Sequence, residues 1–297
     1  MGRYHALQYH DMASAQLVAV CDARSEVAQH YASLYHCRAY TTVDDLLANE
    51  QLDAVSLTVP TSYHYKLAIQ LLESGIPLLV EKPIAQTIEQ AQDIIRLATQ
   101  KQVCLTVGHI ERFNPAVTAL KSLIDSEKMG PVISIHTRRV SPMPTQIRDA
   151  NVAIDLAVHD VDIICWFLKK RPHTVTRFGH AFTLGDRDDL ATIMMAFDDA
   201  VGISEVHWLS PMKERKLTLT ALKGSAELDF VNQTLRWMTE GDVAWRSSSV
   251  TMANALSIQL AHFVACVQTG AKPLVSGEEG LLALQVAVGE TLGTEKL

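Results

Sequence analysis

An aspartate and a histidine stand four residues apart in the apolar segment 153–168, which predicts a helix. Residues with this spacing share one helix face, so Asp155 and His159 should point the same way, with Asp162 continuing the stripe. An imidazole titrates near neutral pH and can accept a proton, and a neighbouring carboxylate can orient it or bond a substrate. The pair therefore suits proton removal from a hydroxyl group, with His159 as the general base.

The same two residues admit plainer interpretations. Asp155 could cap or solvate the start of the helix, and His159 could be a hydrogen-bonded interior histidine. A metal site made with Asp162 and His109 is a weaker alternative, because neither an H-E-x-x-H pattern nor a cysteine pair accompanies these residues. We expect no metal.

A lysine with a defined position, Lys82, follows the short apolar run that begins at Gly75-Ile76-Pro77 and ends in Glu81-Lys82-Pro83. Such a run predicts a strand buried on both faces of a parallel sheet. Ligands bind beyond the carboxyl ends of these strands, so Glu81 and Lys82 should reach a ligand crevice. Lys82 can then donate to a developing alkoxide; the alternative is a solvated lysine at a strand end.

Strands and helices alternate through the first part of the chain. We expect strands at 16–21, 38–41, 53–59, 76–81 and 103–107, and helices at 3–12, 24–35, 43–49, 62–74 and 87–101. This alternation is typical of βαβ crossovers and predicts an α/β, Rossmann-type doubly wound parallel sheet.

The pattern changes after about residue 125. A longer strand at 131–140 and the helix at 153–168 precede several strands over 174–240, and helices at 254–269 and 278–292 complete the chain. We expect a second, α+β domain with a large, mostly antiparallel sheet. The predicted domains are 1–112 for dinucleotide binding and 113–297 for substrate binding and oligomerisation, with a C-terminal helix able to return to the first domain.

Composition narrows the class of protein. The 297 residues are 48% hydrophobic and 20% charged, which is ordinary for a globular protein, and the net charge of -7 has no basic block to bind nucleic acid. Five scattered cysteines without a C-x-x-C pair favour a reducing compartment. With neither a membrane-length apolar run nor a signal peptide in the sequence, we expect a cytoplasmic protein.

A dinucleotide site is indicated by Asp22, an acid at the end of a predicted strand where the fold bonds a ribose diol. Gly2 lies twenty positions earlier and fits the third glycine of the G-x-G-x-x-G fingerprint, whereas the first strand and first two glycines are absent. Either the start codon was assigned too far downstream or the chain was shortened, or the protein lost this strand; we favour the first explanation. As written, the sequence lacks the main-chain amides that hold a pyrophosphate, which puts its affinity for a dinucleotide in question. Asp22 favours NAD over NADP, while Arg24 keeps NADP open.

Several motifs occur in an order that resembles one family. They are V-P-T-S-Y-H at 59–64, E-K-P at 81–83, G-H-I-E-R-F-N-P at 108–115, I-D-L-A-V-H-D-V-D-I at 154–163 and S-G-E-E-G at 276–280. Together they resemble the Gfo/Idh/MocA family of NAD(P)-dependent sugar and polyol dehydrogenases. The resemblance runs from Gly2 to the end of the chain, and it implies oxidation of a sugar hydroxyl to a ketone by hydride transfer from its carbon to NAD.

The resemblance also assigns site residues. It implies that Lys82, Asp155 and His159 are catalytic and that His109 contacts substrate. It places the cofactor against Gly2, Asp22, Pro60, Thr61, His64, Glu81, Lys82, Arg112 and Asn114. Thr61 and Ser62 are also suited to cap the next helix, and Asn114-Pro115 to form a turn before one.

The segments 108–115 and 138–149 resemble the members that act on C3 of UDP-N-acetylglucosamine. Arg138, Arg139 and Arg148 could then bind its diphosphate, although each could equally be a solvated surface arginine. A free sugar or inositol is the alternative substrate, and a non-catalytic relative of the family is a further alternative. The family implies a homo-dimer or homo-tetramer that associates through the sheet of the second domain.

Overall fold

The computed structural model describes residues 1–144 and 151–290, and its internal contacts divide the chain into two compact units. The first unit comprises Met1–Gly108 with Leu256–Glu278, and the second comprises His109–Ala255 with Glu279–Leu297. The first is a Rossmann-like α/β unit and the second contains a large, mostly antiparallel sheet, so the predicted fold class is confirmed.

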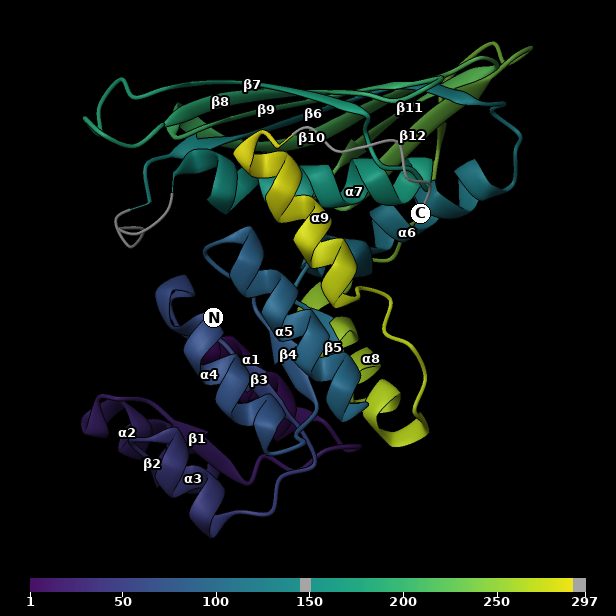
Figure 1. Ribbon diagram of the computed structural model, residues 1–297. Coiled ribbons are helices and arrows are strands. Elements are labelled where there is room, and N and C mark those ends of the chain that lie inside the picture. The colour runs from purple at the N-terminus through teal and green to yellow at the C-terminus, as the bar shows by residue number, and fades with distance from the viewer. Residues whose placement is uncertain (145–150, 291–297) are drawn as a thin grey trace. The chain divides into compact units, whose positions relative to one another are not determined.

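Parallel strands and helices alternate in the first unit, as Figure 1 shows. The strands are β1 (Ala19–Cys21), β2 (Arg38–Tyr40), β3 (Val55–Leu57), β4 (Leu78–Val80) and β5 (Leu105–Val107). The helices are α1 (Gly2–Asp11), α2 (Ser25–Tyr35), α3 (Val43–Asn49), α4 (Thr61–Glu73), α5 (Ile88–Lys101) and α8 (Ala255–Thr269). All three residues of β4 are fully buried, as expected for a strand covered on both faces.

The strands of the first unit form two sheets rather than one. Within the described residues, β1 pairs with β2, and a separate sheet has the order β3-β4-β5. A doubly wound sheet of order 3-2-1-4-5-6 has its first strand between the second and the fourth. The break between β1 and β3 therefore lies at the position that the first strand of a doubly wound sheet would occupy.

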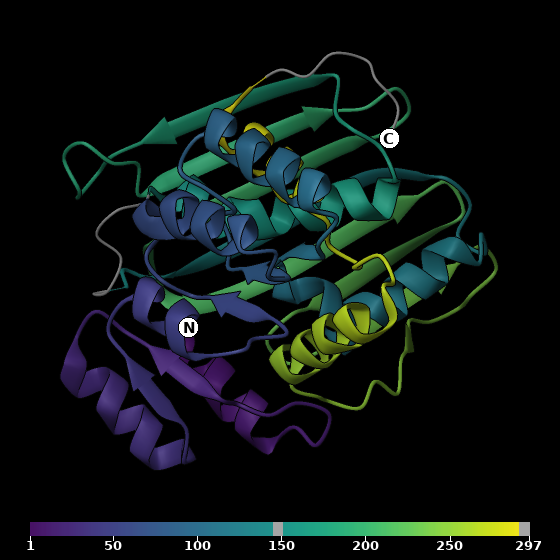
Figure 2. The same cartoon turned by 60° about the horizontal axis from the view of Figure 1, so that its bottom comes forward.

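Local sequence explains how the helices of this unit begin and pack. Thr42 and Thr87 cap α3 and α5, since their hydroxyl oxygens accept from the main-chain nitrogens of Asp45 at 3.1 Å and Gln90 at 3.3 Å. Helix α1 is joined to β3 by a hydrogen bond of 2.7 Å between Tyr9 Oη and Ser56 Oγ. Figures 1 and 2 show α4 and α5 together on one side of the β3-β4-β5 sheet and α8 on the other.

An eight-stranded sheet dominates the second unit, in the order β13-β12-β11-β10-β6-β9-β8-β7. Only β6 and β9 pair in parallel among these strands, which are all within the described residues. Their bounds are β6 (Val132–Pro142), β7 (Thr174–His180), β8 (Leu190–Ala196), β9 (Val201–His207), β10 (Leu209–Ala221), β11 (Gly224–Asp229), β12 (Thr234–Thr239) and β13 (Arg246–Ser247).

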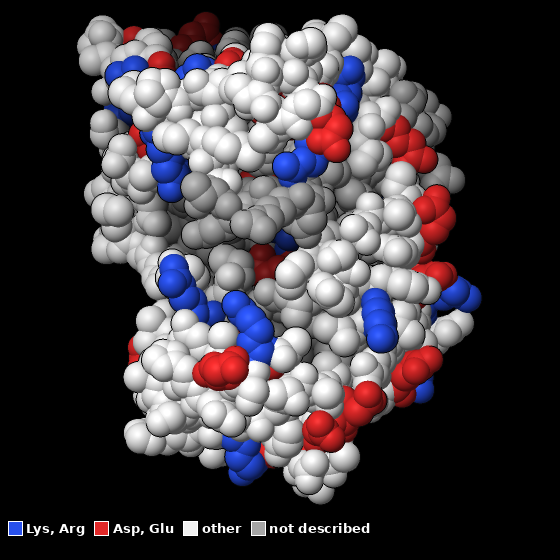
Figure 3. Space-filling view, turned by 90° about the vertical axis from the view of Figure 1, so that its left-hand side faces the viewer, with Lys and Arg blue, Asp and Glu red and all other residues white. Residues whose placement is uncertain are grey.

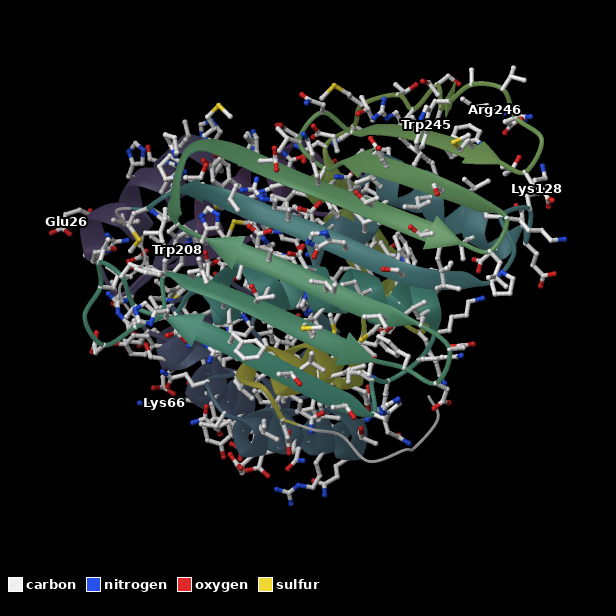
Figure 4. All side chains as sticks on the ribbon, turned by 90° about the horizontal axis from the view of Figure 1, so that it is seen from above. Glu26, Lys66, Lys128, Trp208, Trp245 and Arg246 are labelled. Carbon is white, nitrogen blue, oxygen red and sulfur yellow. The ribbon has the colours of Figure 1, made fainter. Side chains whose placement is uncertain are left out.

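One face of this sheet packs against helices. They are η1 (Ile110–Phe113), α6 (Pro115–Asp125), η2 (Ala153–Ala157), α7 (Val158–Leu168) and α9 (Gly277–Val288). The opposite face is seen in Figure 4, with Trp245 and Arg246 on its β13 edge. Burial alternates accordingly, since Ile193 and Met195 are fully buried whereas Met194 between them is 43% exposed.

The distribution of surface charge and the lengths of the apolar helices are as expected from the composition. On the face shown in Figure 3, basic and acidic side chains of the described residues occur in small, interspersed groups. In the part of the chain that the structure describes, no helix is long and apolar enough to cross a membrane.

Candidate active site

The turn that carries Lys82 leaves the end of β4 and is fixed by neighbouring strands. The main-chain nitrogen of Glu81 donates to Leu57 O at 3.0 Å, and that of Gly108 donates to Val80 O at 2.7 Å. The Glu81 side chain is buried and accepts a hydrogen bond of 3.0 Å from His5 Nε2 in α1. A Cβ added at Gly108 would lie 2.9 Å from the Glu81 carboxylate, so only glycine allows this contact.

On the other side of Lys82, the turn is held by His64 in the first turn of α4. His64 is 1% exposed, with Nδ1 2.8 Å from Pro83 O and Nε2 2.9 Å from Val59 O. Helix α4 begins at Thr61, and Pro60 occupies the capping position without a side-chain hydrogen bond. The expectation that Thr61 or Ser62 caps this helix is therefore wrong, because both already belong to it.

Two residues of the first unit fit a dinucleotide. A Cβ at Gly2, in the first turn of α1, would lie 3.0 Å from Thr58 Oγ1, so glycine permits the close approach of the helix start to the end of β3. Asp22 follows β1 directly, and its pKa is lowered chiefly by the hydrogen bond from the Arg24 side chain. An ionised carboxylate here can bond a ribose diol.

Asp155 and His159 belong to the second unit, where the predicted single helix is in two parts. Residues Ala153–Ala157 form a π-helical turn before α7, and such turns often occur at functional sites. The oxygen Oδ1 of Asn151 accepts from the nitrogen of Ile154 at 2.9 Å, so Asn151 rather than Asp155 caps the helix start. The rings of His159 and buried His109 meet edge to face, with centroids 6.2 Å apart.

Arg112, predicted to contact the cofactor, forms buried ion pairs within the second unit. Its Nη2 lies 2.7 Å and its Nε 2.9 Å from the carboxylate oxygens of Asp162, and its Nη1 pairs with Glu279. Burial lowers the pKa of Arg112, but these two carboxylates raise it by more. Asp162 thus neutralises the buried charge of Arg112. The residue predicted to continue the Asp155–His159 face of the helix therefore pairs with an arginine.

Arg139 and Asn114 are likewise buried and engaged. Arg139 Nε lies 3.0 Å from Asp160 Oδ1, and Arg139 Nη1 lies 2.9 Å from Glu111 Oε1. Asn114 Oδ1 accepts from the nitrogen of Ala116, which caps α6, and its Nδ2 donates to Phe230 O at 3.0 Å. A role for either residue toward a ligand stays a prediction.

Arg138 lies on the opposite face of β6 from Arg139. It pairs with Glu205 at 3.2 Å and Glu214 at 2.5 Å, and its side chain is 40% exposed. Arg148 lies outside the described residues. Of the three predicted phosphate-binding arginines, the two that the structure describes, Arg138 and Arg139, therefore do not come together.

Three residues of interest were not identified from the sequence: Arg215, which interacts electrostatically with Asp155, its neighbour Lys213, and His5 beside Glu81. Arg215 of β10 is in register with Arg139, and its Nη1 lies 3.8 Å from Glu111 Oε1. Burial lowers the pKa of Arg215, and Asp155 is among the acids that oppose the shift. Arg215 in turn is the main cause of a lowered pKa at exposed Lys213, two residues earlier on the strand. The alternation Lys213-Arg215-Leu217 was a usable signal for cations on the face of buried Leu217.

The first unit is Rossmann-like with Asp22 directly after β1, and the second unit contains Asp155, His159 and a large sheet. These features suit an NAD-dependent oxidoreductase of CH–OH groups, and the comparisons with known proteins agree. The model of the oxidoreductase family with NAD-binding Rossmann fold matches residues 1–109. The model of the GFO/IDH/MocA C-terminal domain matches residues 117–227. The chain belongs to the Gfo/Idh/MocA family, as the motifs indicated, and the family model that matches its first unit is that of an NAD-binding Rossmann fold.

Individual relatives cover nearly the whole chain. UDP-N-acetylglucosamine 3-dehydrogenase of Acidithiobacillus ferrooxidans is 28% identical over 99% of this chain and 94% of the relative. A solved structure of that enzyme matches with a TM-score of 0.90, over 98% of this chain and 93% of the other. Inositol 2-dehydrogenase of Rhizobium meliloti is 26% identical over 97% of this chain and 92% of the relative.

Proposed function

We propose that this chain oxidises a ring hydroxyl of a nucleotide sugar, C3 of UDP-N-acetylglucosamine, to a ketone. The observation that supports this choice of substrate is the 28% identity with the Acidithiobacillus ferrooxidans UDP-N-acetylglucosamine 3-dehydrogenase over 99% of this chain. In this proposal, residues 1–112 bind the dinucleotide and residues 113–297 bind the substrate. The second domain also forms a homo-dimer or homo-tetramer through the open face of its sheet.

Three side chains carry the proposed reaction. His159 accepts the hydroxyl proton, Asp155 orients the imidazole or bonds the sugar, and Lys82 donates a hydrogen bond to the oxygen as it becomes an alkoxide and then a ketone. Bound NAD would supply the acceptor for the hydride from the carbon that bears this hydroxyl, so that one alcohol and NAD would give one ketone, NADH and a proton. We assign Gly2, Asp22, Pro60 and Thr61 to holding the cofactor.

Lys213 and Arg215 are the proposed contacts of the diphosphate. Arg215 meets Glu111 on one face of β10 and its side chain is 33% exposed, and the charges of Arg215, Arg139 and Glu111 all act on Lys213. The lowered pKa of Lys213, caused first by the charge of Arg215, is consistent with two cations that repel each other. An anion bound against both would relieve this repulsion, and guanidinium and ammonium groups suit phosphate oxygens.

Charge removal tests the nucleotide-sugar substrate. Lys213→Met with Arg215→Met should raise KM for UDP-N-acetylglucosamine about 10- to 100-fold, the effect of losing hydrogen bonds to charged groups. Activity toward a sugar without phosphate should change little. The matched control is Lys216→Met with Arg138→Met, which removes two cations from the opposite face of the same strands. Equal KM values in both double variants would refute the diphosphate site.

Inositol is the second candidate substrate. The Rhizobium meliloti inositol 2-dehydrogenase is 26% identical over 97% of this chain, close to the value for the nucleotide-sugar enzyme. Inositol lacks a phosphate. This alternative therefore predicts that NADH forms from inositol and that the Lys213 and Arg215 substitutions leave the KM for inositol unchanged.

A further inference from the structure

Two buried histidines converge on the segment Glu81-Lys82-Pro83 from different helices. His5 of α1 contacts the Glu81 side chain, and His64 of α4 contacts the Pro83 carbonyl. The two imidazoles are 2% and 1% exposed, and Lys82 is the residue between their partners. The proposed reaction uses neither imidazole for proton transfer.

Each contact fixes a different part of the turn. The Glu81 carboxylate accepts from His5 Nε2 at 3.0 Å and lies against Gly108, where an added Cβ would be 2.9 Å away. The Pro83 carbonyl lies 2.8 Å from His64 Nδ1, while Val59 O lies 2.9 Å from His64 Nε2. His64 thereby links the residue after Lys82 to Val59, in the loop between β3 and α4.

The two partners of His64 are both carbonyl oxygens, which only accept hydrogen bonds. A neutral imidazole carries one N–H, so it can donate to Pro83 or to Val59, whereas the imidazolium can donate to both. Burial lowers the pKa of His64, and the two carbonyls and Glu81 partly oppose the shift. Of the two neutral tautomers, only the one with hydrogen on Nδ1 can donate to Pro83 O and so hold the Lys82 turn.

We propose that His64 and His5 are positioning residues, which hold the Lys82 ammonium group in place through Pro83 O and the Glu81 carboxylate. This inference rests on the proposed function of Lys82 as the donor to the reacting oxygen. It also gives His64 a different role from the predicted cofactor contact, since both of its ring nitrogens already lie against main-chain carbonyls. Displacing a donor by a fraction of a hydrogen-bond length can cost about 10²-fold in rate.

Asparagine and glutamine substitutions separate positioning from general packing. An asparagine amide nitrogen can occupy the place of histidine Nδ1, and a glutamine amide nitrogen the place of Nε2, because the numbers of bonds from Cβ match. His64→Asn can keep the Pro83 contact and His64→Gln only the Val59 contact. For His5 the order reverses, since Nε2 is the bonded atom and only His5→Gln can keep the Glu81 contact.

The expected result is a crossed pattern in kcat. His64→Asn and His5→Gln should retain kcat within about threefold, while His64→Gln and His5→Asn should lose about 10- to 100-fold with KM for the sugar nearly unchanged. Melting temperatures measured on the same full-length variants should not follow this pattern. If kcat falls in parallel with melting temperature in all four variants, the histidines are merely structural and the inference is wrong.

A readout independent of turnover distinguishes failure of this inference from failure of the proposed function. Lys82 can be followed by the NMR titration of its dimethylated amine, identified by its absence in Lys82→Met. The NMR titration curve of the dimethylated Lys82 amine should differ from that of the wild type in His64→Gln and His5→Asn, and in neither of the other two variants. The same titration in all variants would overturn the inference, even if no sugar tested yields NADH.

Discussion

Arg139 and Asp160 form a buried ion pair between β6 and α7, with Arg139 Nε 3.0 Å from Asp160 Oδ1 and side chains 2% and 1% exposed. Ser204 Oγ donates to the other oxygen of Asp160 at 3.1 Å, and Glu111 accepts from Arg139. Burial lowers the pKa of Arg139, but Asp160 and Glu111 raise it by more, so the net direction is upward. This network joins the sheet to α7, the helix that carries His159.

Arg139→Met should therefore destabilise the protein by about 3–5 kcal/mol, because it leaves Asp160 as a buried charge without its partner. Arg138→Met, one residue earlier, removes an exposed arginine and should cost about 0–1 kcal/mol. Chemical denaturation of both variants measures the difference. Equal losses would contradict the assignment of buried and exposed faces to β6.

Lys82→Met tests the proposed donor while keeping most of the apolar stem of the side chain. Since the ammonium group would stabilise charge only as the reaction proceeds, kcat should fall about 10²- to 10⁴-fold while the Kd for NAD stays within a few-fold. Lys66→Met, at an exposed position of α4, is the control and should retain full activity. Retention of kcat by Lys82→Met would exclude Lys82 from the reaction.

The hydrogen-bonded Tyr9 predicts how stability depends on alkaline pH. Burial raises the pKa of Tyr9 from 10.0 to about 12, against the opposing effect of the Ser56 hydrogen bond. Because the unfolded chain ionises first, this contribution is intact below pH 10 and is lost as pH rises toward about 12, by roughly 2–3 kcal/mol. Tyr9→Phe should abolish this part of the decline, and Tyr63→Phe, at an exposed position, should keep it. Identical pH profiles for wild type and Tyr9→Phe would contradict the buried environment.

Elements with a clear local signal could be predicted from the sequence. The strands expected at 16–21, 53–59 and 76–81 contain β1, β3 and β4, and β10 is among the strands expected over 174–240. The break between β1 and β3 could also be predicted, because the order of strands in a doubly wound sheet is known. The π-helical turn could not, since its sequence Ala-Ile-Asp-Leu-Ala is compatible with an ordinary helix.

Site residues held by distant partners were beyond sequence reasoning. Strand geometry puts Arg138 and Arg139 on opposite faces, but which one is buried depends on Asp160, 21 positions away. The contact between His5 and Glu81 joins residues 76 positions apart and has no local pattern. Lys213 and Arg215 could have been found, because they alternate with buried Leu217 on one strand.

The proposed reaction of this chain is hydride transfer from a nucleotide sugar to NAD. The most direct measurement is NADH formation by the purified full-length chain with UDP-N-acetylglucosamine, N-acetylglucosamine and inositol in parallel, with Lys82→Met as the inactive control. We predict NADH and a stoichiometric keto-sugar from UDP-N-acetylglucosamine and little from the other two. NADH formed from inositol alone, or from none of the three while NAD binds, would contradict this proposal.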